Sequence, residues 1–527
     1  MLDLNSSKTR FVIVGGGSAG WLTALFVKKH YPNINVTVIE SKDIGILGAG
    51  EGTTPHFVTM LDELGIPSSE ILKHANGTIK NGIKFTNWNG DKEHYHHNFA
   101  TFGNLDYDNT TIINYSDTAM IVAEEIANSR SLNRVDFTSL ANDRGLVKFI
   151  AKNNITVPPP NPILYFNGLG KFALHFNAHK LADFLKTVGV SRGINVVEGI
   201  ISKITTDKEG YITSLKLENN KTVKCNFVFD CTGFHRLIIG KHYNSVWKSY
   251  KEYLPVNRAL PFFRKIDNDI PPYTESIAMK YGWVWKIPLQ DRYGCGYVFD
   301  SNLVSDEDVK KEINELCGEQ VEIPRAFSFE AGAYKQQWVK NCIATGLASG
   351  FVEPLEATSI WVTITALRKF LVHIKGVTYK NETHIKLFNN AMNKMTDDIL
   401  TFVHFHYLTK RTDTLFWKDF NKNNKTPELI QKLIDNDKDL TILANDGLID
   451  NVFPFFSYQQ VGAGIKYFNQ EEAKKTFDSL NTGLRQNAYK TAKEFYLRDI
   501  NLALTSLPKH KDFINFLITG QSDHDKR

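Results

Sequence analysis

The first forty residues alternate between apolar runs and a glycine-rich turn, a pattern that predicts two strands connected by a helix. Residues 11–14 are apolar and β-branched, residues 19–29 repeat apolar positions with helical spacing, and residues 36–39 are apolar again. Glycines separate the first strand from the helix. The pattern therefore predicts a βαβ unit at the start of the chain.

Two later apolar runs end as the first one does, at a turn of small residues. They span residues 227–230 and 342–344, and they predict further strands that end in glycine turns. From about residue 377 onward helical patterns replace strand patterns. The remaining predicted elements are a helix over 176–188, a strand over 195–197, a hairpin turning at 209–210, the strand 283–288 and helices over 360–371, 428–435, 470–480 and 487–504.

The charge balance and the cysteine count exclude several classes of protein. Lysine and arginine total 62 against 57 acidic residues and are spread along the chain, so we expect no nucleic-acid partner. The five cysteines are odd in number and form no CxxC pair, which argues against a disulfide framework or a zinc site. A reducing, cytoplasmic location fits best.

One segment imitates a secretory leader, because Lys8 and Arg10 precede the apolar run 11–27. The centre of that run is rich in glycine and too short to span a bilayer. We therefore expect no membrane association.

The glycines of the first turn form a dinucleotide-binding fingerprint, Gly15-x-Gly17-x-x-Gly20, with Ser18 and Ala19 at the start of the helix. The first glycine permits a tight turn, the second admits a pyrophosphate, and the third allows the helix to pack closely. Glu40, at the end of the next strand, would accept hydrogen bonds from ribose hydroxyls. This unit leaves FAD and NAD open, and the later strand that ends at Asp230 favours FAD.

Trp283 and Trp285 belong to the alternating run Trp-Val-Trp-Lys-Ile-Pro, so on a strand both point to the same face. Taken alone, they would be read as core tryptophans.

The whole set of motifs resembles the flavin-dependent tryptophan halogenases, over most of residues 10–420. Trp283–Pro288 matches the WxWxIP signature of that family, and Gly15–Trp21 matches its GGGxAGW motif. Further matching segments are Ser41–Pro55, which contains Ala49 and Gly50, then Phe176–Ala178, Asp230–Phe234 and Gly346–Thr358.

The resemblance implies an FADH2-dependent enzyme that uses dioxygen and a halide (chloride, bromide or iodide) to form hypohalous acid. The acid reaches an electron-rich aromatic substrate through an internal tunnel, and a separate flavin reductase supplies the reduced flavin. The two tryptophans would shield the flavin from the substrate. Homo-oligomerisation is left open.

The resemblance also assigns roles to individual residues. Lys80 matches the catalytic lysine, which would either hydrogen-bond hypohalous acid or form a haloamine. Glu356 matches the catalytic carboxylate, which would stabilise the arenium intermediate and accept its proton. Lys84 is expected on the same side of the same strand as a surface residue, and Glu353 as a glutamate that merely favours a helix start. Halide would bind at Thr358 and Ser359, and Val197 and Gly346 would join the cofactor site.

The resemblance implies an α/β fold in two modules. Residues 1–376 would form a Rossmann-like FAD-binding module of the GR2 type, with part of the substrate pocket inserted at about 86–165. A mainly helical substrate-binding module, residues 377–527, would pack against it.

Three departures from the family concern the coupling of the sites and the substrate. Ala357 replaces the usual serine after the catalytic glutamate, and Ala100 stands where tryptophan-specific enzymes have a histidine, although Phe102 is retained in the pocket. The segment 455–460 lacks an expected tryptophan. We therefore expect an indole- or phenol-type substrate other than free tryptophan.

The clustered histidines of the chain are not expected to bind metal. They are His94, His96 and His97 in one loop and His404 and His406 in another, without a spaced carboxylate partner. Two other functions are open at this point: an FAD-dependent aromatic monooxygenase and a flavin-binding redox regulator without turnover.

Overall fold

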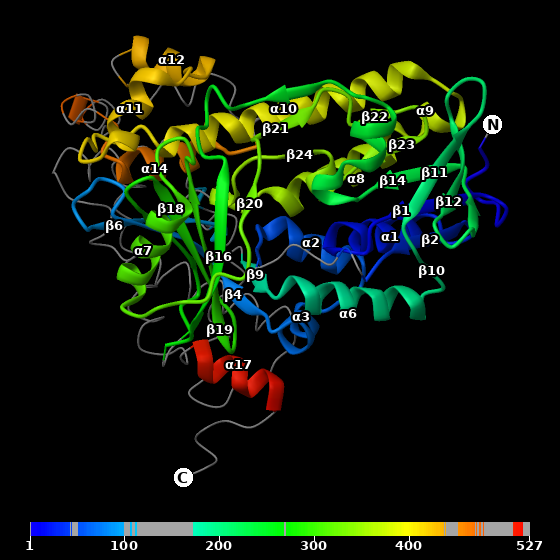
Figure 1. Ribbon diagram of the computed structural model, residues 1–527, viewed down its shortest axis with the longest axis horizontal. Coiled ribbons are helices and arrows are strands. Elements are labelled where there is room, and N and C mark those ends of the chain that lie inside the picture. Colours follow the sequence, from blue (N-terminus) through cyan, green and yellow to red (C-terminus); the bar gives the residue numbers. More distant parts are fainter. Residues whose placement is uncertain are drawn as a thin grey trace.

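The computed structural model describes residues 2–42, 44, 51–99, 106–107, 111–112, 172–267, 270–436, 438, 452–468, 471, 474–475, 478 and 510–519. Figure 1 shows a parallel sheet with its helices at one end and a second large sheet at the other. The 25-residue helix α10 (Glu382–His406) runs along both.

The predicted βαβ unit is present as β1 (Arg10–Val14), α1 (Ser18–His30) and β2 (Asn35–Glu40). These strands belong to a six-stranded sheet of order β10-β2-β1-β14-β23-β22. The first five strands pair in parallel and β22 is antiparallel. Parallel strands place all their carboxyl ends at one edge, so the turns after β1, β2, β14 and β23 meet there. The other members are β10 (Asn195–Glu198), β14 (Phe227–Asp230), β22 (Trp338–Val339) and β23 (Cys342–Ala344).

The strands of this sheet are apolar on both faces because both faces are covered. In β1, Phe11 and Ile13 belong to the main core, whereas Val12 and Val14 pack under the hairpin of β11 (Ile201–Thr206) and β12 (Ile212–Leu217). This explains the continuous apolar run of the strand in the sequence.

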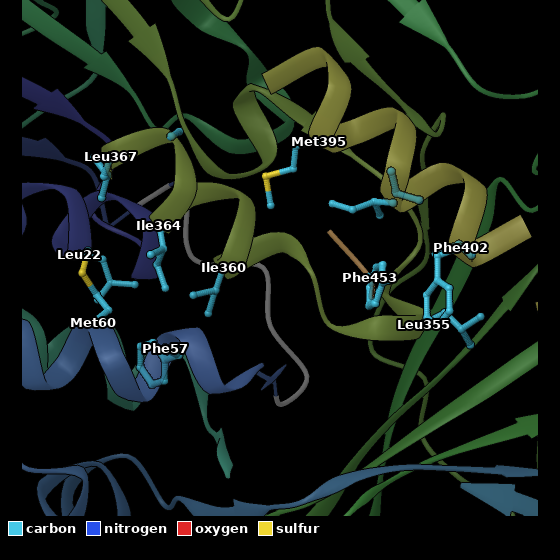
Figure 2. Packing of buried hydrophobic residues seen from close by; sticks show 14 of the residues in the cluster. Leu22, Phe57, Met60, Leu355, Ile360, Ile364, Leu367, Met395, Phe402 and Phe453 are labelled. Carbon is cyan, nitrogen blue, oxygen red and sulfur yellow. The ribbon is translucent and has the colours of Figure 1, made fainter. Parts of the chain in front are cut away.

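Helix α8 (Ser359–His373) packs against α1 and α2 (Pro55–Glu63) through apolar residues spaced four and three apart. Figure 2 shows Ile360, Ile364 and Leu367 of α8 facing the side chains of the two other helices. This packing fixes α8, which begins at Ser359 shortly after Glu356, against α1 and α2.

A seven-stranded sheet of order β20-β16-β19-β18-β17-β5-β6 forms the other half of the molecule. Its neighbours are antiparallel except for the parallel pair β17 and β5. The predicted alternation in β18 is present, because Trp283 lies in the main core and Val284 in a separate cluster on the opposite face. The strands are β5 (Gly82–Thr86), β6 (His94–Asn98), β16 (Arg258–Lys265), β17 (Thr274–Ala278), β18 (Gly282–Pro288), β19 (Arg292–Phe299) and β20 (Phe327–Ser328).

A three-stranded sheet connects the two halves, with the order β3 (Glu51–Gly52), β9 (Ala173–Phe176) and β4 (Thr78–Lys80). It corrects two predictions. Lys80 and Lys84 do not share a strand, because the chain changes sheets at Asn81 between β4 and β5. The helix predicted from residue 176 begins at residue 178 as α6 (Ala178–Ser191), since Asn177 caps its first backbone amides.

All the elements that the structure describes after residue 375 are helices: α9 (Lys375–Thr378), α10, α11 (Leu415–Asn423), α12 (Glu428–Asp435), α14 (Phe455–Gly464) and α17 (His510–Thr519). Helix α10 packs on α8, and α14 packs on β6. The predicted helix 428–435 is confirmed, whereas 487–504 and most of 470–480 lie outside the described residues. The two-module division stays a prediction. No helix within the described ranges is long and apolar enough to cross a membrane.

The first turn gives a stability prediction with a matched control. A Cβ atom on Gly20 would lie 1.9 Å from the carbonyl oxygen of Gly15, whereas a Cβ atom on Gly17 would meet nothing within 4 Å. We expect Gly20→Ala to lower the free energy of unfolding by about 3 kcal/mol or more, although alanine normally favours a helix. Gly17→Ala should lower it by no more than about 1 kcal/mol, the usual effect of alanine at a helix N-cap. Chemical denaturation of the apoprotein measures both values, and equal stability of the two variants would contradict the packing described.

Candidate active site

The glycine turn, the start of α1 and the turn after β14 come together at the carboxyl edge of the parallel sheet. Gly15 has φ +120°, and a Cβ atom there would lie 2.3 Å from the carbonyl oxygen of Cys231. Of the three fingerprint glycines described, Gly17 alone has open space where a side chain would lie. The turn therefore brings backbone amides to an accessible point without obstruction by a side chain.

The first turn of α1 carries polar groups without partners. No side chain caps the helix, and the buried hydroxyl of Ser18 has no hydrogen-bond partner in the described part of the chain. Ala19 packs closely against Gly346. A Cβ atom added at Gly346 would lie 2.8 Å from the Cβ atom of Ala19. A helix start with free amides is a suitable site for phosphate oxygens.

Glu40 lies at the end of β2, with its carboxylate beside Gly16 and paired with Lys186 of α6. Val197 lies on the neighbouring strand, where it is the register partner of Ile39. Both predicted cofactor residues thus lie at the edge that carries the glycine turn. Ala49 and Gly50 lie outside the described residues.

Lys80 ends β4, and its side chain is fully buried. Its Nζ atom has no hydrogen-bond partner among the described residues. Burial lowers the pKa of Lys80 to about 7, against the opposing effect of the Glu356 charge. A substantial fraction of the side chain is therefore a neutral amine near pH 7.

Small and neutral groups surround this amine. A Cβ atom on Gly52 would lie 3.1 Å from Nζ of Lys80, 3.2 Å from Oγ1 of Thr274 and 3.5 Å from the ring of His175. Nζ also lies 5.4 Å from the ring centroid of Phe99. A side chain at position 52 would therefore crowd the amine from the β3 side.

His175 is a neutral wall of the lysine site. Thr78 donates its hydroxyl proton to the carbonyl of Pro288 (2.7 Å), so it accepts from Nδ1 of His175 (2.9 Å). Nε2 is then the acceptor for the Thr274 hydroxyl (2.9 Å). Burial, followed by the charge of Lys80, holds the pKa of His175 well below its usual value. His175 is therefore uncharged, and both of its ring nitrogens are bonded to threonines. It does not accept a hydrogen bond from the Lys80 amine.

Glu356 lies in the short turn Pro354–Glu356, buried between two histidines from different elements. Nδ1 of His97, on β6, is 3.0 and 2.9 Å from Oε1 and Oε2 of Glu356. Nε2 of His406, at the end of α10, is 2.9 Å from Oε1. Burial alone would raise the pKa of Glu356, but His97 and His406 together hold it at about 2. The carboxylate is therefore ionised throughout the physiological range.

The two histidines differ in their second contact. Nδ1 of His406 lies 2.8 Å from the carbonyl oxygen of Phe402, which can only accept, so Nδ1 is the donor of this bond. Its Nε2 lies near the carboxylate without meeting hydrogen-bond geometry. Nε2 of His97 lies 3.0 Å from the hydroxyl of Ser457, which can donate or accept.

Glu353 is a buried structural carboxylate, and its expected role as a residue that favours a helix start is wrong. It makes no capping bond, and its Oε2 accepts hydrogen bonds from the indole of Trp283 (2.7 Å) and the hydroxyl of Tyr407 (2.5 Å). Glu353 and Glu356 thus hold two consecutive residues at the end of α10, Tyr407 and His406. Burial raises the pKa of Glu353 to about 7, although both donors oppose this rise.

The two tryptophans of β18 pack on one face of the seven-stranded sheet. Trp283 is fully buried, and Trp285 is partly exposed, with its ring 6.3 Å from that of Trp283. A Cβ atom on Gly296 would lie 2.1 Å from the Trp285 ring, so the indole lies flat on the neighbouring strand. Trp283 is anchored through Glu353, and Trp285 is the member of the pair that reaches an accessible surface.

The predicted halide residues lie at the start of α8. Thr358 is the residue before the helix and is buried, Ser359 begins the helix, and no side chain caps it. Ala357 has φ +54°, a left-handed conformation that turns the chain between Glu356 and α8. The carboxylate and the free helix start are thereby adjacent.

Sequence reasoning missed the partners of both central residues. His97 and His406 were considered only as metal ligands, and within the described ranges no group of three or more metal-ligating side chains is present. The alternation of side chains along β6 could have indicated this role, because it places His97 on the opposite face of the strand from His94 and His96. Phe102 and Ala100 lie outside the described residues, and Phe99 is the described aromatic beside Lys80.

Comparison with known proteins agrees with this geometry. The tryptophan halogenase family model matches residues 10–479. The chain is 29% identical over 448 residues to tryptophan 6-halogenase ThaL of Streptomyces albogriseolus, covering 80% of this chain and 81% of that protein. It is 28% identical over 460 residues to tryptophan 7-halogenase RebH of Lentzea aerocolonigenes, with 81% of each covered. The solved structure of tryptophan 6-halogenase SttH from Streptomyces toxytricini superposes with a TM-score of 0.81 at 26% identity, over 96% of this chain and 99% of that one.

The buried carboxyl of Glu353 gives a pH prediction. Its pKa in the native protein is about 7, above the unfolded value, so the native state retains a proton that the unfolded chain releases as pH rises above about 4.5. The contribution of Glu353 to stability therefore declines as pH rises toward 7. Glu353→Gln stays neutral, and we expect its free energy of unfolding, relative to wild type, to rise by up to about 3 kcal/mol between pH 5 and pH 8.

Glu356→Gln is the matched contrast for this measurement. The pKa of Glu356 is about 2, so its contribution is fully present above about pH 4.5 and is lost as pH falls toward 2. That variant should be less stable than wild type at neutral pH. Denaturant titrations from pH 5 to pH 8 that gave parallel curves for wild type and Glu353→Gln would contradict the raised pKa.

Proposed function

The chain belongs to the tryptophan halogenase family and is a flavin-dependent halogenating enzyme, and on that premise we propose that Lys80 carries the halogen while Glu356 receives the proton of the aromatic substrate. The observation that carries the proposal is the pair of buried groups with opposite protonation behaviour. Lys80 is an amine that loses its proton near pH 7, and Glu356 is a carboxylate that keeps its charge.

The residues at the edge of the parallel sheet fit the cofactor FAD. The open space over Gly17, the uncapped start of α1 and the orphaned hydroxyl of Ser18 suit a pyrophosphate, and Glu40 suits a ribose. When bound and reduced, FAD would supply the electrons with which dioxygen and halide become hypohalous acid. We assign the cofactor site to these residues with Ala19, Gly346 and Val197.

Lys80 would take the halogen from hypohalous acid. A neutral amine attacks the halogen, forms an N–halogen bond and releases water, and the aromatic carbon then takes the halogen from nitrogen. Burial favours this route over hydrogen bonding by an ammonium, because it lowers the pKa of Lys80 and leaves the amine without an acceptor in the part of the protein that the structure describes.

Glu356 would accept the proton that the aromatic carbon loses, and its negative charge would stabilise the arenium cation before that transfer. A carboxylate with a pKa of about 2 is a weak base, but an arenium is a far stronger acid. The nitrogen of Lys80 regains the proton equivalent, so the site returns to its starting state. The halide itself would bind at the free amides of Thr358 and Ser359.

The substrate is an electron-rich aromatic, and we propose an indole- or phenol-type compound other than free tryptophan. ThaL and RebH are named for tryptophan. Ala100 and the segment 455–460 depart from the pattern of such enzymes. We further propose a separate flavin reductase as the source of reduced flavin, and a reducing compartment, since none of the five cysteines forms a disulfide.

An activity panel tests the function. With FAD, a flavin reductase and chloride, bromide or iodide, the enzyme should convert indoles or phenols to products in which halogen replaces hydrogen, as seen by mass spectrometry. Products that gain only oxygen would instead indicate a monooxygenase. Tight FAD binding without any product would indicate a flavin-binding regulator.

Lys80 has a matched control in Lys84, which pairs with Glu275 at 3.6 Å on the neighbouring strand. We expect Lys80→Met to lower halogenation by about a thousandfold while reduced flavin is still oxidised, and Lys84→Met to retain activity within about threefold. In wild type, kcat should rise with pH through about 7, because the amine is the reactive form. Equal activity of the two variants would exclude Lys80 from the reaction, and a rate that falls through pH 7 would exclude the amine route.

A further inference from the structure

We propose that His97 is a positioning residue for the proposed halogen transfer: it fixes the direction of the Glu356 carboxylate by contacting both of its oxygens while Ser457 holds the other side of the ring. The inference rests on the proposed function, in which Glu356 must present a charged oxygen to the substrate.

The contacts of His97 connect three elements around one carboxylate. His97 lies on β6, Glu356 in the turn before α8, and Ser457 on α14. Nδ1 lies within 3.0 Å of both carboxylate oxygens, so the imidazole contacts both oxygens rather than one. The ring also packs against Phe402 and Phe453, at centroid distances of 5.3 and 6.3 Å, which restricts its rotation. Figure 2 shows Phe402 and Phe453 side by side near Leu355, the residue before Glu356.

The second histidine of the centre holds Glu356 less completely. Nε2 of His406 lies 2.9 Å from one carboxylate oxygen without meeting hydrogen-bond geometry, and its Nδ1 lies 2.8 Å from the carbonyl oxygen of Phe402. Nδ1 of His97 contacts both carboxylate oxygens, and its Nε2 faces the hydroxyl of Ser457, which can donate or accept. His97 is therefore the histidine whose two ring nitrogens are both held by side chains of the centre.

Four ionisable groups among the described residues interact electrostatically with Glu356. His97 and His406 lower its pKa, Lys80 interacts with it across the site, and the hydroxyl of Tyr95 on β6 feels its field. Burial acts in the opposite direction and favours the protonated acid. Without His97, one favourable contact would remain against the full cost of burial. The carboxyl would then bind a proton in the range where the enzyme works and could no longer receive one from the substrate.

Two variants of similar size separate this role from packing. In His97→Asn the amide nitrogen can take the position of Nδ1 and still donate to Glu356. In His97→Gln the longer side chain places its amide nearer the position of Nε2 and Ser457. A residue that merely fills space would make both variants equally poor. His96→Asn on the same strand is the control, since that ring lies beside Tyr273 instead.

We expect His97→Gln to lower kcat by roughly ten- to a hundredfold at pH 7, as for the loss of a hydrogen bond to a charged group, with a small change in KM. The ratio of its rate to the wild-type rate should fall further as pH decreases from 8 to 5, because Glu356 then becomes protonated. His97→Asn should stay within about tenfold of wild type with a nearly constant ratio, and His96→Asn within about threefold.

Infrared spectroscopy of the apoprotein tests the same point without turnover. The carbonyl band of a protonated carboxylic acid is recorded from pH 8 to pH 4, and the spectrum of the same variant with Glu356→Gln is subtracted to isolate Glu356. The band should be absent in wild type and His97→Asn and should grow in His97→Gln. A band in wild type, no band in His97→Gln, or equal rate losses in the Asn and Gln variants would overturn the proposal. Wild-type enzyme that makes no halogenated product would refute the proposed function, and the infrared result would still decide the role of His97.

Discussion

The burial of the Lys80 amine, with no hydrogen-bond partner among the described residues, is the constraint on which the rest of the site depends. A buried ammonium costs several kcal/mol unless it is paired, so burial without a partner favours the neutral amine and lowers the pKa of Lys80 to about 7. Two polar groups of the site already have other partners. His175 is fixed between two threonines, and Glu356 lies between two histidines. The lysine is thereby kept as an amine that can react.

The fold makes this arrangement possible because three separate elements meet at the site. The small sheet of β3, β9 and β4 carries Lys80, the seven-stranded sheet carries His97, and the turn Pro354–Glu356 before α8 carries Glu356. Two carboxylates three residues apart hold the end of α10, one through His406 and the other through Tyr407. The helical part of the chain is thus fixed to the centre by charges and hydrogen bonds as well as by apolar packing.

Local patterns in the sequence predicted the local parts of this site. The glycine turn, the strand with the two tryptophans and the helix after Glu356 depend on spacing within a few residues, and all three are present. The identities of Lys80 and Glu356 came from motifs. The partners of these two residues could not be predicted from motifs. His97 is 259 residues from Glu356 in the chain, and its pairing depends on how β6 lies against the turn that contains Glu356. The approach of His406 to Glu356 likewise depends on how the end of α10 packs against the turn Pro354–Glu356, which no local sequence pattern indicates.

The central claim is that the halogen passes through Lys80, and one measurement tests it most directly. The enzyme is allowed to consume reduced flavin, dioxygen and bromide without an aromatic substrate, small molecules are removed by rapid gel filtration, and an indole is then added. We predict close to one equivalent of bromoindole per wild-type protein and none from Lys80→Met. Equal yields from the two proteins, or no product from wild type that is active in steady state, would contradict the account.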